Sequence, residues 1–214
     1  MITKYKLYTE NKNNFKEISD WKFNIVNDNI PELRKMLDDG FDINTNKMEE
    51  NSLKFAFKMK SYRSVLFLID NGANIDNGDD IPYFMYAIRI DSKYYREKII
   101  KKLIKNGADI NATDNDGDIV LQWALDLNRP LSTIEFLIDN GADINHVSTD
   151  LESVVYTASQ NLENLYLILD HNPIITDYRF IEIMDENDKR KLKKDYPDIY
   201  NKYLKWKKVE DFNL

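Results

Sequence analysis

Short apolar stretches alternate with polar turns along most of the chain. In residues 134–138 the apolar side chains have the spacing of one helix face. A polar segment with a glycine follows each such stretch, and a second short apolar segment precedes it. Neither segment is long enough to form a stable helix alone. The pattern therefore predicts pairs of short helices that bury one continuous core by stacking on their neighbours.

One short segment carries the repeat. Its copies with glycine are residues 37–44, 68–76, 103–111 and 137–145, and the glycines lie 32, 35 and 34 residues apart. A degenerate fifth copy, residues 168–176, has asparagine at the glycine position, and asparagine also tolerates a left-handed backbone. We expect each of these positions to end a helix in the left-handed conformation: Gly40, Gly72, Gly107, Gly141 and Asn172.

The preceding helix of each pair is centred on an alanine. These alanines are Ala56, Ala87, Ala124 and Ala158. Their small side chains let two helices approach closely. The Ile of each glycine segment can lie beneath the turn, and the final Asn or Asp can hydrogen-bond the loop backbone.

These residues resemble the ankyrin repeat, which has a period of 33 residues and a helix opening of Thr-Pro-Leu-His-x-Ala. The Gly-Ala-Asp-Ile-Asn segments match closely, whereas no helix opening keeps the Thr-Pro pair or the His. The resemblance covers about residues 20–176. It implies an all-α solenoid of stacked helix-turn-helix units with hairpin-like loops between repeats.

Three regions are expected on this basis. Residues 1–19 lack the repeat and form an N-terminal extension or cap, residues 20–176 form about five repeats, and residues 177–214 form a helical C-terminal cap broken at Pro197. The first and last repeats are divergent. The extra residues at 89–96 either lengthen a helix or push out the loop between two helices.

Charge and composition narrow the functional classes. The net charge of the chain is -7. From residue 181 onward, nine Lys and Arg residues against eight Asp and Glu residues give the tail a charge of +1, so the rest of the chain carries -8. With no cysteine and two histidines, the chain lacks the residues for a disulfide scaffold, a thiolate zinc site or a multi-histidine metal centre. No apolar stretch follows the N-terminal residues, so we expect a cytoplasmic protein, or one in a host cytoplasm if it is viral or a secreted effector.

Three features invite a chemical role, and each has a simpler interpretation. Residues 114–118 resemble a calcium loop, but the glycine is at the fourth position and the twelfth is Leu125, which favours a turn. His146 and His171 lack a catalytic partner at a recognisable spacing. Acidic residues flank the basic run 189–194, which favours a solvated helix face over nucleic-acid binding. We expect no active site, cofactor or metal.

The resemblance implies binding to another protein through the hairpin tips and the exposed side of the first helices, which together would form a concave surface. The acidic tip residues would attract a basic partner. The candidate binding residues are Glu49, Glu50, Met59, Asp79, Asp80, Tyr83, Arg89, Ile90, Asp114, Asp116, Asp118, Asp126, Leu127, Asp150 and Glu152. Met59, Ile90, Leu127 and Tyr83 are the expected apolar anchors.

The sequence thus predicts a non-enzymatic protein-binding module, monomeric when unbound, that acts as an inhibitor or effector. An immunity protein that occludes a cognate toxin is the alternative. An enzyme and a scaffold with several weak partners stay open as further classes.

Overall fold

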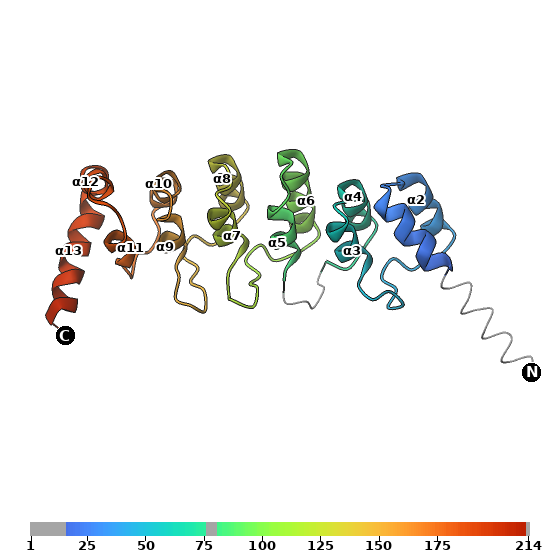
Figure 1. Ribbon diagram of the computed structural model, residues 1–214, viewed down its shortest axis with the longest axis horizontal. Helices are drawn as coiled ribbons and strands as arrows, with labels where there is room; N and C mark the ends of the chain where they lie inside the picture. The colour runs from blue at the N-terminus through green and yellow to red at the C-terminus, as the bar shows by residue number, and fades with distance from the viewer. Residues whose placement is uncertain (1–15, 76–80, 213–214) are drawn as a thin grey trace, which may run out of the picture. The chain divides into compact units, whose positions relative to one another are not determined.

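A computed structural model describes residues 16–75 and 81–212, with side chains as far as residue 208. The chain divides into two compact units, Met1–Asp109 and Ile110–Leu214. Helices are the regular structure of the described residues, and their only β-type pairing is an isolated bridge between Val147 and Ser153. The predicted all-α architecture of helix pairs is confirmed within each unit (Figure 1).

The first unit contains a helix over residues 16–26 and then five further helices. These are α2 (Ile30–Asp38), α3 (Ser52–Lys58), α4 (Tyr62–Asp70), α5 (Tyr83–Ile88) and α6 (Lys93–Lys105). Helix α4 packs against α2, α3 and α6, and α5 packs against α3 and α6. First helices therefore stack on first helices, and second helices on second helices.

The second unit repeats this arrangement. Its helix pairs are α7 (Val120–Asp126) with α8 (Leu131–Asp139), and α9 (Val154–Ala158) with α10 (Leu162–Asp170). Helix α7 packs against α8 and α9, and α10 packs against α8 and α9. The hairpin loop between α8 and α9 extends beyond the first helices, on the side away from α8 and α10 (Figure 1).

The glycine segments end the second helices as predicted. The backbone φ angles are 97°, 85°, 91° and 96° at the four glycines and 55° at Asn172, so all five positions are left-handed. The final Asn of the segment was expected to hydrogen-bond the loop backbone, and in the structure it bonds the backbone of the next loop along the chain. Asn111 Nδ2 donates to Gly141 O at 3.0 Å, and Asn111 Oδ1 accepts from Asp143 N at 2.8 Å, so one side chain joins two consecutive loops.

The same link recurs elsewhere within each unit. Asn44 makes the equivalent pair of bonds to Gly72 O and Asn74 N, and Asn145 Oδ1 accepts from Ile174 N at 2.7 Å. A single side chain thereby satisfies backbone groups that the turn leaves without partners. The four helix-centre alanines are fully buried, as their role at the close approach of two helices requires: Ala56, Ala87, Ala124 and Ala158.

The extra residues at 89–96 lengthen a helix. Helix α6 has 13 residues, whereas α4, α8 and α10 have nine each. The structure therefore decides between the two alternatives that the sequence left open.

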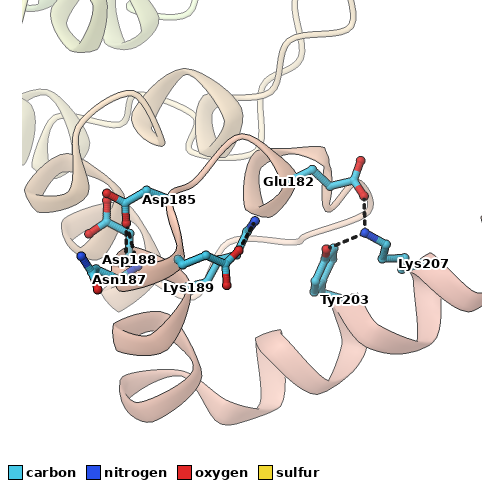
Figure 2. Close-up of polar contacts among 8 residues, drawn as sticks. Glu182, Asp185, Asn187, Asp188, Lys189, Tyr203 and Lys207 are labelled. Atoms are coloured by element: carbon cyan, nitrogen blue, oxygen red, sulfur yellow. Dashed lines mark hydrogen bonds and ion pairs between the residues drawn. The ribbon is translucent and has the colours of Figure 1, made fainter.

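The C-terminal tail forms α11 (Arg179–Glu182), α12 (Glu186–Asp195) and α13 (Pro197–Phe212), and the expected break falls at Tyr196, directly before Pro197. Asp185 caps α12 by accepting from Asn187 N and Asp188 N, and Lys189 pairs with Glu186 (Figure 2). Lys207 on α13 contacts both Tyr203 and Glu182, which ties α13 to α11. Among the described residues, no helix has the length and apolar character needed to cross a membrane.

Candidate protein-binding surface

The tip at residues 114–118 is a turn organised by one carboxylate. Asp114 Oδ1 accepts from Asp116 N at 3.1 Å and from Asp118 N at 3.0 Å, while Oδ2 accepts from the Trp123 indole at 2.8 Å. Gly117 supplies the left-handed backbone, with φ of 81°. These bonds make 114–118 the turn that its spacing favoured. Over residues 16–75 and 81–212, no group of three or more His, Asp or Glu residues is arranged to hold a metal ion.

The next tip, residues 146–152, is bonded to the first. Thr149 donates to Asp116 O from its amide at 3.1 Å and from its hydroxyl at 2.5 Å. His146 Nε2 lies 2.7 Å from Gly117 O, so this nitrogen carries the proton. A Cβ on Gly117 would lie 2.8 Å from Thr149, which leaves no room for a side chain there. Hydrogen bonds therefore join the two tips into one continuous edge.

Carboxylates converge along this edge. The pKa of Asp118 is raised from 3.8 to about 6, first because the group is partly buried. Four negative charges add to the effect: those of Asp114, Asp126, Glu152 and Asp116. The pKa of Asp126 is also raised, by burial and then by Glu152. The fold brings five of the candidate residues into one electrostatic cluster, which we call the acidic edge: Asp114, Asp116, Asp118, Asp126 and Glu152. The exposed Asp150 lies in the same tip as Glu152.

Apolar side chains flank the acidic edge, and the sequence did not single them out. Val147, Leu151 and Ile174 are 47%, 67% and 72% exposed. Val147 and Ile174 line a hollow of about 240 Å³, together with Val155 on α9. The sequence could have indicated them through an apolar residue directly beside a charged residue in a polar tip, as at Asp150 and Leu151.

Leu151 is held in an unusual conformation. Its φ is 62°, a left-handed value that is uncommon for a bulky residue. Hydrogen bonds on both sides fix it: its amide donates to Ser148 O at 3.1 Å, and its carbonyl accepts from Arg179 Nη2 at 3.2 Å. The fold thus keeps a strained residue with its side chain in solvent, which is typical of functional sites.

Two predicted anchors are wrong because their side chains are buried. Tyr83 is 2% exposed; its ring stacks on Phe57, and its hydroxyl donates to Asn51 at 2.7 Å. Ile90 is 3% exposed. Helix α5 ends one residue past Ala87, so Ile90 lies beyond the helix cap, and the loop turns its side chain inward.

The other candidates of the first unit lie at the surface. Glu49 and Arg89 are exposed, and Met59 is 44% exposed at the end of α3. Glu50 forms a 2.5 Å ion pair with Lys58, so its charge is partly neutralised. In the second unit, Asp126 is exposed as a whole residue although its carboxyl group is partly buried, and Leu127 is 42% exposed at the end of α7. Asp79 and Asp80 lie outside the described residues.

Comparison with known proteins agrees with the fold. A model of the family described as ankyrin repeats (many copies) matches residues 92–138, which span α6, the Gly107 segment, α7 and most of α8. No curated protein matches the chain. Ankyrin repeats are protein-protein interaction modules and are generally not enzymes. The match shows ankyrin repeats within residues 92–138, and the helix pairs and left-handed helix ends of the described residues are consistent with an ankyrin-type solenoid.

Proposed function

We propose that the chain is a non-enzymatic binding module that recognises a basic surface of another protein through the acidic edge and its apolar flank. The observation that carries this is the convergence of five carboxylates along the acidic edge before any partner arrives; the pKa of Asp118 is raised first by burial and then by the charges of the other four. A cationic partner would relieve the electrostatic repulsion among these carboxylates. The free protein already bears this unfavourable energy, so its relief would favour binding. Opposite charges also steer the encounter and raise the association rate.

Charge alone supplies little affinity at an exposed surface. The flanking Val147, Leu151 and Ile174 supply apolar area that a partner would bury, at about 25 cal/mol per Å². The hydrogen bonds that fix the two tips mean that little conformational entropy is lost on binding. Covering a target in this way suits an inhibitor or effector, and equally an immunity protein that occludes a toxin. We propose that the unbound chain is a monomer.

The test is comparative affinity capture from cells of the source organism, read by quantitative mass spectrometry. The tip variant is Asp116→Lys with Glu152→Lys, two residues of the acidic edge. The matched control is Glu135→Lys with Asp139→Lys, which makes the same charge change on exposed residues of α8. We expect a partner recovered with the wild type and the control to be lost with the tip variant, and its binding to weaken with added salt. Equal recovery with all three proteins contradicts the acidic edge as the binding surface.

Leu151→Gly tests the apolar flank separately. Glycine adopts the left-handed backbone without strain, so this variant keeps or gains stability while it removes the exposed side chain. We expect it to weaken capture of the same partner. Recovery equal to the wild type would limit the binding surface to its charged part. A recovered partner that is a toxin, with its activity blocked by this chain, would decide for the immunity role.

A further inference from the structure

A second cavity lies in the second unit, away from the hairpin tips. Its volume is about 410 Å³, and it is bounded by the end of α10, the loop before α11, and the junction of α12 and α13. Pockets that bind ligands typically have volumes of about 300–1,000 Å³. This cavity reaches that range, whereas the hollow beside Val147 does not.

The lining of this cavity is suited to a cation. It includes three carboxylates, those of Asp170, Asp195 and Asp198, and one cation, Lys202. Asp170 and Asp195 are also the last residues of α10 and α12, whose C-terminal carbonyl groups carry partial negative charge. An anionic ligand would be repelled from such a site.

Two tyrosines give the cavity aromatic surface. Tyr178 and Tyr196 line it, and the Tyr196 hydroxyl donates to Asp170 Oδ1 at 2.5 Å. The pKa of Tyr196 is raised by burial, then by its hydrogen bond to Asp170 and the charges of Asp170 and Asp195. Burial also raises the pKa of the neighbouring Tyr166 to about 12, with the charge of Asp195 as the next cause. Both phenols therefore experience the negative field of these carboxylates.

We propose that this cavity binds one arginine side chain of a partner protein. A guanidinium group is planar, stacks on aromatic rings, and presents a fork of donors that fits carboxylates. The carboxylates select for charge, and the aromatic lining favours a flat cation over the compact, strongly hydrated ammonium of lysine. The site shares no residue with the acidic edge, so it does not depend on the function proposed above.

The test is an NMR titration of the full chain with the peptide acetyl-Gly-Arg-Gly-amide. The matched control ligand contains citrulline, which has nearly the shape of arginine without its charge. We expect saturable shifts at the amides of Ile175, Ile199 and Lys202, which line the cavity, with the arginine peptide and not with the citrulline peptide. The same peptide with lysine in place of arginine should bind at least about threefold more weakly than the arginine peptide.

Two sets of variants separate this site from general attraction to an acidic protein. Asp195→Asn and Asp198→Asn change exposed residues, so the fold should persist, and each should weaken binding about three- to fivefold. Asp116→Asn with Glu152→Gln alters the acidic edge and should leave the affinity unchanged. The proposal is overturned if the shifts do not saturate, if both cavity variants bind as the wild type does, or if the acidic-edge variant abolishes binding at the cavity.

Discussion

The α5–α6 pair and the α7–α8 pair end in nearly the same segment, residues 103–111 and 137–145, yet they expose different side chains. In both, the glycine is left-handed and the preceding helix ends in the same way. Three positions after the helix-centre alanine, Ile90 is 3% exposed and Leu127 is 42% exposed. The motif thus specifies how a helix ends, and it does not specify which residue of the inter-helix loop faces solvent.

The physical cause lies in the helix lengths. Helix α7 continues for two residues past Ala124, so Leu127 caps the helix at the surface. Helix α5 stops one residue past Ala87, and the following loop turns Ile90 inward. Arg96 of the longer α6 then donates to Ile90 O at 2.6 Å and to Asp91 O at 3.2 Å, and this arginine is itself 2% exposed. The lengthened helix supplies the donor that holds the loop in place.

The largest expected effect compares these two positions directly. Ile90→Gln should lower the free energy of unfolding by about 3 kcal/mol, because it places an amide in a buried apolar site. Leu127→Gln should lower it by less than about 1 kcal/mol, because the side chain already contacts water. Urea unfolding of both variants measures the difference. Similar values for the two would mean that Ile90 is accessible after all.

A smaller effect should be shared by the two helix pairs. Gly107→Ala and Gly141→Ala should each cost about 1 kcal/mol, since both glycines have φ above 90° and a Cβ there meets no other atom within 4 Å. Backbone strain is then the only cause, and it is the same at both sites. Thermal unfolding of the two variants should give losses that agree within about 0.5 kcal/mol. A much larger loss at one glycine would show that its surroundings contribute as well.

The smallest effect concerns the tip before α7. The raised pKa of Asp118 means that its ionised form is disfavoured in the folded protein, so its contribution to stability declines as the pH rises from about 4 to 6. Asp118→Asn removes this penalty. It should therefore stabilise the protein at pH 7 by up to about 1 kcal/mol, after allowance for solvent screening of a half-exposed group.

The pH dependence provides the control for this prediction. Below about pH 4 the wild-type carboxyl is neutral in both the folded and the unfolded protein, so the stabilisation by Asp118→Asn should disappear there. Urea unfolding at about pH 3 and at pH 7 measures both values. A constant difference between the two proteins would show that the effect does not arise from the charge.

Several elements were predictable because their causes are local. The glycine and Asn172 ends follow from backbone sterics, and the pairing of short helices follows from apolar spacing and length. The break at Pro197 follows from the missing amide of proline. The acidic tips could be recognised from their residues alone, whereas the burial of Tyr83 could not, because it depends on Phe57 and Asn51 in the preceding helix pair.

The sequence by itself determined the repeat, the left-handed helix ends, the acidic character of the tips and the lack of cysteine. These follow from the identity and spacing of side chains. Only the tertiary structure decided that Asn111 joins consecutive loops and that four other carboxylates lie near enough to Asp118 to raise its pKa. It also decided that the α12–α13 junction and the end of α10 line one cavity. The bonds of Asn111 join residues about 30 apart in the chain, and Glu152 belongs to a different tip from Asp118, so no local pattern encodes these contacts.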